Sequence, residues 1–176
     1  MNDPGPLIIL VGFMGAGKSV VGRLLARRLG RCFVETDDMI VAREGRSIPE
    51  IFREAGETRF RQLEAETLEL LKQKRGDVVA TGGGFSCVAG RMDVLRSLGT
   101  VIWLKGDLEE MCERARRGGV RPMLSQRTAA EVEALHRERE RYYGQAHLVI
   151  ETRGLGVDQV VARILAVLRQ PHGARV

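Results

Sequence analysis

The segment from Gly12 to Ser19 has the residue types and the spacing to bind a polyphosphate. Its pattern, G-x-x-x-x-G-K-S, lies between a short apolar run, Leu7 to Val11, and an amphipathic segment, Val20 to Leu29. This order predicts a strand, a glycine loop and a helix. In such a loop the backbone N–H groups and the helix dipole face phosphate oxygens, while Lys18 would reach the β- and γ-phosphates and Ser19 a magnesium ion. The spacing and its flanks favour a nucleotide site over a glycine-rich turn before an ordinary helix.

The length and composition are typical of one globular domain, residues 1–176. Hydrophobic residues make up 44% of the chain and charged residues 29%, and no apolar run is long enough to cross a bilayer. The N-terminus lacks the basic and apolar regions of a secretory signal. Cys32, Cys87 and Cys112 are odd in number and far apart, which argues against a disulfide framework or a zinc site. We therefore predict a cytoplasmic protein with no membrane partner.

The net charge of +5 and the pI near 9.6 are compatible with a nucleic-acid partner or with small anionic ligands. Most of the 28 basic residues are arginines, so an arginine at any one position is weak evidence by itself. Aromatic residues make up only 5% of the chain and do not alternate with the basic residues, so no base-stacking surface is indicated. We predict no nucleic-acid partner.

Apolar segments that alternate with helix-like sequence predict an α/β fold. Five candidate strands are Leu7 to Val11, Cys32 to Val34, Asp77 to Ala80, Thr100 to Leu104, and His147 to Ile150. Candidate helices are Val20 to Leu29, Asp37 to Glu44, Ser47 to about Lys74 with a pause near Gly56, Met92 to Leu98, Asp107 to Arg116, Thr128 to about Tyr143, and Val157 to Leu168. Capping boxes mark the starts at Ser47 and Thr128. The alternation predicts a parallel sheet covered by helices on both faces.

The second candidate strand leads into the acidic sequence Glu35-Thr-Asp-Asp38. In a parallel sheet this end lies at the same edge as the glycine loop. If the chain stays extended, Glu35 and Asp37 point to one side, where they suit a magnesium-bound water and a substrate hydroxyl respectively. The alternative is that Asp37 or Asp38 only caps the following helix. Spacing alone supports both interpretations equally.

Three consecutive glycines, Gly82 to Gly84, follow the third candidate strand at the same edge. They either let the backbone approach a ligand closely or form a flexible turn. In the preceding helix Arg59 and Arg61 are candidate ligands, but pairing with Glu57 or Glu64 in the same helix is the simpler explanation.

Two further groups of arginines follow. Arg121 lies beside two glycines and a proline in a segment that interrupts the helical pattern, so we predict a lid over residues 112–127. A closing lid would bring Arg121 to the phosphates and exclude water; the alternative is a loop arginine in solvent. Arg137, Arg139 and Arg141 alternate with glutamates, which predicts a solvated helix face.

With these motifs the chain resembles the shikimate kinases. The resemblance runs from Leu7 to about Leu168. It rests on Gly-Phe-Met-Gly-Ala-Gly-Lys-Ser, Glu-Thr-Asp at 35–37, Gly-Arg-Ser-Ile at 45–48, Phe-Arg at 60–61, Gly-Gly-Gly at 82–84 and Arg-Pro-Met-Leu at 121–124. It implies a three-layer P-loop fold with a five-stranded parallel sheet in order 2-3-1-4-5. It also implies that a monomer transfers the γ-phosphate of ATP, with Mg²⁺, to the 3-hydroxyl of shikimate in aromatic amino-acid biosynthesis.

The resemblance assigns roles to individual residues. Lys18, Asp37 and Arg121 would act in phosphoryl transfer, and the substrate would lie against helices within about residues 37–62. The expected shikimate ligands are Asp37, Arg61, Gly83, Gly84 and Arg139; the expected nucleotide ligands are Gly15, Ala16, Gly17, Lys18, Ser19, Val20, Arg114, Arg121 and Arg153; the expected magnesium ligands are Ser19 and Glu35.

The chain departs from the family pattern in two places. The family usually has Asp-x-Asp where this chain has Glu35-Thr-Asp37, so the side chain on the magnesium side is one methylene longer. The late arginine that binds the substrate carboxylate normally stands four residues before a tyrosine. Counting from Tyr143 gives Arg139, whereas counting from Tyr142 gives Glu138. We choose Arg139, because a carboxylate ligand must be basic.

Two other functions fit parts of the pattern. One is a different small-molecule kinase of similar fold, acting on gluconate or a nucleoside monophosphate, and Arg61 with the triple glycine argues against it. The other is a catalytically silent relative that binds a nucleotide as a regulatory module. The presence of Lys18, Ser19, Asp37 and Arg121 argues against that function.

Overall fold

A five-stranded parallel sheet forms the centre of the computed structural model, which describes residues 5–117 and 127–169. The strands are β1 (Leu7–Val11), β2 (Phe33–Glu35), β3 (Val78–Ala80), β4 (Gly99–Lys105) and β5 (Leu148–Glu151). They pair in the order β2-β3-β1-β4-β5, and every pairing is parallel. This confirms the predicted fold and strand order.

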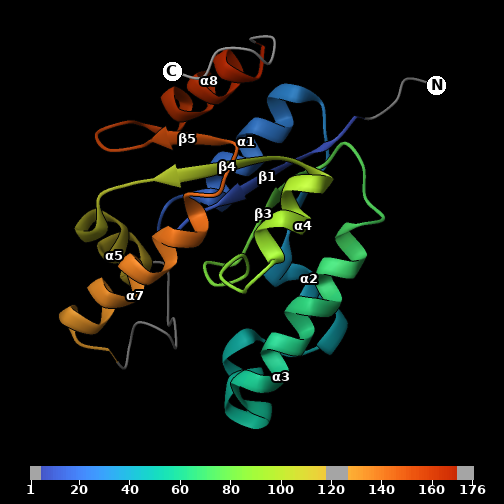
Figure 1. Cartoon of the computed structure of the whole chain (residues 1–176), viewed down its shortest axis with the longest axis vertical. Coiled ribbons are helices and arrows are strands. Elements are labelled where there is room, and N and C mark those ends of the chain that lie inside the picture. Colours follow the sequence, from blue (N-terminus) through green and yellow to red (C-terminus); the bar gives the residue numbers. More distant parts are fainter. Residues whose placement is uncertain (1–4, 118–126, 170–176) are drawn as a thin grey trace.

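Helices cover both faces of this sheet. They are α1 (Lys18–Leu29), α2 (Thr36–Glu44), α3 (Ile48–Leu71), α4 (Arg91–Leu98), α5 (Leu108–Arg117), α7 (Ala129–Tyr143) and α8 (Val157–Arg169). In Figure 1, α1 and α8 lie above the sheet, and α4 and α7 lie below it. The boundaries differ from the predicted ones by only a few residues, because apolar periodicity and turn residues mark element centres better than element ends.

The central strand explains why the candidate strands are continuous apolar runs. All five residues of β1 are buried, because helices pack on both faces of a parallel sheet and no side of the strand meets water. Each such side chain contributes roughly 1.5–3 kcal/mol to folding relative to an exposed one. The result is a rigid frame. Its C-terminal edge carries the glycine loop, Gly12 to Ser19, and the turn formed by Gly82 to Gly84, the glycine turn.

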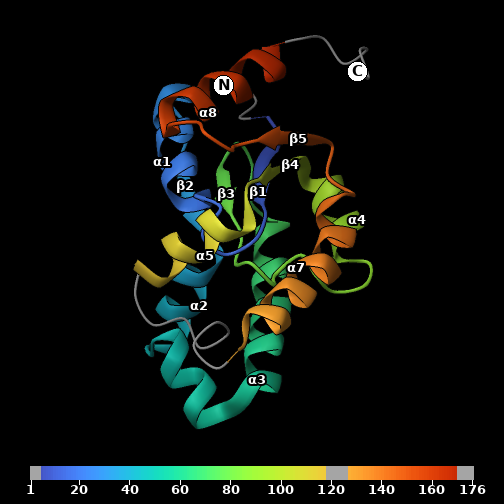
Figure 2. The ribbon, with the colours of Figure 1, turned by 90° about the vertical axis from the view of Figure 1, so that its left-hand side faces the viewer.

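The helices α2 and α3 extend beyond this frame. Figures 1 and 2 show the N-terminal half of α3 beside α2 and away from the sheet. A separate small cluster, Ile40, Ile51, Phe60 and Leu63, holds the two helices together. The helix α3 bends at Gly56, whose backbone is not helical (φ 74°, ψ 175°), which confirms the predicted pause.

Local helix signals are also confirmed. Both capping boxes are present, with Ser47 and Glu50 at the start of α3 and with Thr128 and Glu131 at the start of α7. The side chain of Asp107, just before α5, accepts hydrogen bonds from the backbone N–H groups of Glu109 and Glu110, as an N-cap does.

The predicted lid lies only partly within the described residues. In the predicted lid, residues 112–117 are helical and belong to α5, whereas 118–126, with Arg121, lie outside the described residues. Within the described ranges the three cysteines are free thiols. No helix there has both the length and the apolar character needed to cross a bilayer.

Candidate active site

The phosphate loop connects β1 to α1 in a conformation that requires glycine. Gly15 has a positive φ of 78°, and a Cβ atom there would overlap the carbonyl oxygen of Met111, so a larger residue does not fit. The buried side chain of Lys18 donates from Nζ to the carbonyl oxygens of Gly12 (2.7 Å) and Phe13 (2.9 Å). The ammonium group is therefore held inside the loop. Ala16 is buried there as well, while Gly17 is the N-cap of α1 in a left-handed conformation.

The two predicted magnesium ligands lie side by side. The hydroxyl of Ser19 donates to Oε1 of Glu35, and Nη2 of Arg23 is 3.3 Å from Oε2 of the same carboxylate. Among the described residues no three His, Cys, Asp or Glu side chains gather at metal-binding distance. Kinase sites hold Mg²⁺ with only one or two protein oxygens, the remaining ligands being phosphate and water. A serine hydroxyl and one carboxylate therefore suit this ion.

The backbone at Asp37 is helical. Strand β2 ends at Glu35 and α2 begins at Thr36, so Asp37 lies in the first turn of a helix, as the candidate helix from Asp37 to Glu44 predicts, and the alternative that needed an extended chain through Glu35 and Asp37 does not hold. An acidic residue is favoured in a first helical turn because it faces the positive end of the helix dipole. The N-cap position belongs to Glu35, so Asp37 is not the capping residue.

The start of α2 is held against the glycine turn. Oγ1 of Thr36 accepts a hydrogen bond from the backbone N–H of Gly82 at 2.9 Å. A Cβ atom built at Gly82 would lie 2.5 Å from Oδ1 of Asp37. The carboxylate of Asp37 thus lies at the edge of the sheet, next to the turn that follows β3.

The same turn meets two arginines from other helices. A Cβ atom at Gly84 would lie 3.1 Å from Nη1 of Arg61, which comes from α3, and 3.1 Å from Nη2 of Arg139, which comes from α7. Three successive glycines thus bring together one carboxylate and two guanidinium groups. This close approach favours the ligand-site interpretation of the triple glycine over a flexible turn.

The burial of Arg139 contradicts one prediction about the arginines of α7. It is only 5% exposed, so the predicted solvated face is wrong for this residue, whereas Arg137 is exposed and pairs with Glu133. The guanidinium of Arg139 lies over the ring of Phe13, 5.6 Å from its centre. Its Nη1 is buried and has no hydrogen-bond partner among the described residues. Glu138 is exposed, so only Arg139 has the position that a ligand at this turn needs.

Tyr143 lies one helical turn after Arg139 and is a site residue that the sequence analysis used only to locate Arg139. It is fully buried, and its hydroxyl donates to the carbonyl oxygen of Gly83 at 2.5 Å. Burial raises the pKa of this phenol well above its usual value, so the hydroxyl stays protonated and remains a donor. Tyr143 thereby holds the glycine turn against α7.

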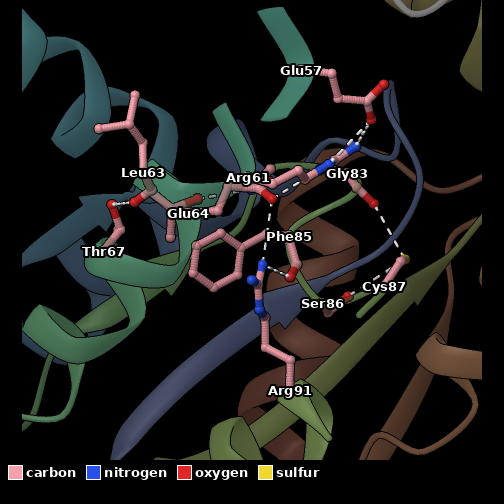
Figure 3. A network of polar contacts seen from close by, with 12 residues as sticks. Glu57, Arg61, Leu63, Glu64, Thr67, Gly83, Phe85, Ser86, Cys87 and Arg91 are labelled. Carbon is pink, nitrogen blue, oxygen red and sulfur yellow. Dashed lines mark hydrogen bonds and ion pairs between the residues drawn. The ribbon is translucent and has the colours of Figure 1, made fainter. Parts of the chain in front are cut away.

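Arg61 both pairs within its own helix and lines the site. Its Nη2 is 2.9 Å from Glu57 and its Nη1 is 2.8 Å from Glu64 (Figure 3). Burial lowers the pKa of Arg61, but the two carboxylates outweigh burial, so the net shift is upward and the group stays charged. Arg59 points elsewhere and pairs with Glu44 at 2.7 Å.

The remaining predicted nucleotide ligands differ in how closely they approach the loop. Nη1 of Arg114, on α5, is 3.5 Å from the carbonyl oxygen of Gly15. Val20 is 55% exposed at the start of α1, and Arg153 lies in the exposed turn between β5 and α8. The structure therefore brings Arg114 to the phosphate loop.

The chain matches the family model for shikimate kinase over residues 14–169. The chain belongs to the shikimate kinase family. A curated shikimate kinase from Persephonella marina is 43% identical over 162 residues, covering 92% of this chain and 98% of that protein. This membership confirms the predicted family and identifies the chain as an ATP-dependent phosphotransferase.

Solved structures of shikimate kinases have the same fold. The crystal structure of the Aquifex aeolicus enzyme superposes with a TM-score of 0.83 at 37% identity and covers 92% of this chain and 95% of its own. The Acinetobacter baumannii enzyme, solved in complex with shikimate, gives a TM-score of 0.84 at 36% identity, with 93% of each chain covered. These family members support the fold over nearly the whole chain.

Proposed function

We propose that this chain transfers the γ-phosphoryl group of ATP to the 3-hydroxyl of shikimate and releases ADP and shikimate 3-phosphate, a step in aromatic amino-acid biosynthesis. One observation carries the proposal: the glycine turn brings the carboxylate of Asp37 and the guanidinium groups of Arg61 and Arg139 to the sheet edge that bears the phosphate loop. Shikimate is a small carboxylic acid with hydroxyl groups, so it has the functions that this set of side chains recognises. The complex of the Acinetobacter baumannii relative with shikimate supports the same substrate.

The two arginines bind the carboxylate of shikimate. Arg139 offers a buried Nη1 without a hydrogen-bond partner among the described residues, and a planar guanidinium suits a carboxylate. Arg61 approaches the same glycine turn from α3. Glu57, which pairs with Arg61, is 57% exposed and can move into water when the substrate carboxylate takes its place. Gly83 and Gly84 contact the substrate through their backbone.

Asp37 orients the acceptor hydroxyl and takes its proton late in the transfer. Phosphoryl transfer depends mainly on alignment and on stabilising charge on the γ-phosphoryl oxygens. Lys18 provides part of that charge by exchanging the carbonyl oxygens of its own loop for phosphate oxygens. Arg121 provides a further positive charge from the proposed lid and helps to exclude water, which competes as the acceptor.

The nucleotide binds through backbone N–H groups of residues 15–20, with Arg114 and Arg153 on the side of the base. Ser19 and Glu35 hold Mg²⁺, which when bound neutralises charge on the β- and γ-phosphates. The extra methylene of Glu35 relative to the usual Asp is compatible with this role, since its carboxylate already reaches the Ser19 hydroxyl. A single-domain monomer with core residues 7–169, in the cytoplasm and without a nucleic-acid partner, remains our prediction.

An acceptor panel tests the proposed function. The purified protein is incubated with ATP and Mg²⁺ together with shikimate, gluconate or AMP, and ADP release is followed with a coupled assay. We expect sustained ADP release only with shikimate. Release with gluconate or AMP but not with shikimate would assign a different kinase, and nucleotide binding without release on any acceptor would indicate a catalytically silent relative.

The glycine turn gives a separate prediction. Gly84→Ala places a methyl group 3.1 Å from the guanidinium groups of Arg61 and Arg139, and both must shift by a few tenths of an ångström. We expect the KM for shikimate to rise about tenfold, because small misplacements of binding groups are costly, while the KM for ATP stays within about twofold. The control is Gly156→Ala, where the nearest atom to a Cβ is 3.7 Å away. An unchanged KM for shikimate in Gly84→Ala would show that the two arginines do not need this turn.

A further inference from the structure

Arg91, the first residue of α4, lies behind the proposed carboxylate site and takes no direct part in the mechanism above. Its Nη1 donates to the carbonyl oxygen of Phe85 at 2.7 Å and lies 3.4 Å from Oε2 of Glu64. The Arg91 side chain is only 8% exposed, and its Cζ atom is 5.1 Å from the centre of the Phe85 ring. A buried arginine in this place needs an explanation, since arginine is rarely buried without a specific partner.

Glu64 stands between two positive charges. Its side chain is 1% exposed, and its Oε2 lies 2.8 Å from Nη1 of Arg61. Figure 3 shows Arg61 and Arg91 directed at this carboxylate from α3 and from α4. A buried carboxylate requires compensation by a positive charge. If Arg61 were the only positive charge beside Glu64, the Arg61–Glu64 pair would be neutral overall and would attract a substrate carboxylate only weakly.

The second arginine changes this balance. With Arg91 present, one buried carboxylate is shared by two guanidinium groups. These three side chains together carry one net positive charge once the exposed Glu57 has moved away from Arg61. The bond from Arg91 to the Phe85 carbonyl also fixes the chain directly after Gly84, where a Cβ atom would lie 3.1 Å from Arg61. Arg91 therefore connects the glycine turn to the helix that carries Arg61.

We propose that Arg91 is a positioning residue for the substrate carboxylate. It offsets the negative charge of Glu64, so that the positive charge of Arg61 stays available to the substrate. It also holds the glycine turn in a fixed position relative to α3. This inference rests on the proposed function of Arg61. Among the described residues the hydrogen bonds of Arg91 go to Glu64 and to the Phe85 carbonyl, so we expect its effect to be confined to binding of the carboxylate.

The test compares substrate constants in Arg91→Met, which keeps much of the buried volume but removes the charge. We expect the KM for shikimate to rise about tenfold, the size of a typical coupling between neighbouring charged groups, with the KM for ATP within about twofold. Arg91→Lys restores the charge and is expected to recover most of the loss. Arg96→Met, an exposed arginine of the same helix that pairs with Asp93 at 3.8 Å, is the matched control and is expected to behave as wild type.

Two measurements separate this role from a merely structural one. Adding Glu64→Gln to Arg91→Met removes the charge that Arg91 offsets, so the double variant is expected to bind shikimate several-fold more tightly than Arg91→Met alone. In calorimetric titrations, binding of the uncharged methyl ester of shikimate is expected to change less than about twofold in Arg91→Met, because the ester has no carboxylate to be recognised. A structural role would weaken both ligands equally and would not be rescued by Glu64→Gln.

The outcomes distinguish this inference from the proposed function. If wild type does not turn over shikimate in the same assay, the proposed function is wrong, and this inference is overturned with it. If wild type is active and Arg91→Met leaves the KM for shikimate unchanged, only the role of Arg91 is overturned. If Arg91→Met does not fold, Arg91→Lys and Glu64→Gln decide: a KM for shikimate close to that of wild type in both variants would support the proposal, and losses of similar size for shikimate and its methyl ester in both variants would overturn it.

Discussion

Replacing Asp37 with asparagine is expected to lower kcat about 10²- to 10⁴-fold, the usual contribution of a positioned general base. Asparagine keeps the shape of the side chain beside Gly82 but cannot accept the hydroxyl proton. Because asparagine keeps the size and shape of the side chain beside Gly82, we expect the affinity for ATP to stay the same. Steady-state kinetics with saturating shikimate, together with a nucleotide-binding titration, measure both quantities.

Asp38 provides the control for this change. It lies in the same turn of α2, but its side chain is 73% exposed, so Asp38→Asn removes an equal charge without touching the site. We expect near wild-type kcat for Asp38→Asn. A kcat for Asp37→Asn within about threefold of wild type would remove Asp37 from the chemistry, since a general base is worth far more than that.

Replacing Arg139 with methionine is expected to raise the KM for shikimate by about 10²-fold or more, the typical cost of losing one partner of a buried charge pair. The guanidinium is nearly inaccessible to water and lies over Phe13, so water cannot replace it as a ligand of the carboxylate. Arg139 also lies over Phe13 of the phosphate loop, but methionine keeps an apolar contact with that ring, so the KM for ATP should change little. Initial rates over a range of both substrates separate the two constants.

Arg137→Met is the matched control on the same helix. Arg137 is exposed and pairs with Glu133 at 2.6 Å, and such surface pairs contribute at most about 1 kcal/mol. We expect unchanged constants for both substrates. A large effect in Arg137→Met with none in Arg139→Met would move the carboxylate site to the other face of α7.

The sheet and most helices could be predicted because their signals are local. Continuous apolar runs indicate strands buried on both sides, and the capping boxes at Ser47 and Thr128 depend on residues only three apart. The boundary between β2 and α2 is harder, because strand and helix preferences compete over two residues there. For that reason the spacing left open whether Asp37 continues an extended strand end or begins the helix, although both interpretations place it at the observed edge of the sheet.

The spacing of the arginines could not predict which of them are buried at the site and which are exposed. Arg139 alternates with glutamates just as a solvated residue does, and only the packing of α7 against Phe13 and the glycine turn makes it buried. The bond from Tyr143 to Gly83 joins residues 60 positions apart. The contact of Arg91 with Glu64 is likewise long-range, at 27 positions. Such contacts leave no local pattern in a single sequence.

The chemical identity of the product tests the proposed function most directly. The protein is incubated with ATP, Mg²⁺ and shikimate, and the product is examined by ³¹P–¹H correlation NMR, which identifies the carbon that bears the phosphate. We expect stoichiometric ADP and a phosphate ester at the 3-oxygen of shikimate. A phosphate on another hydroxyl, or ADP formed with inorganic phosphate and unchanged shikimate, would contradict it.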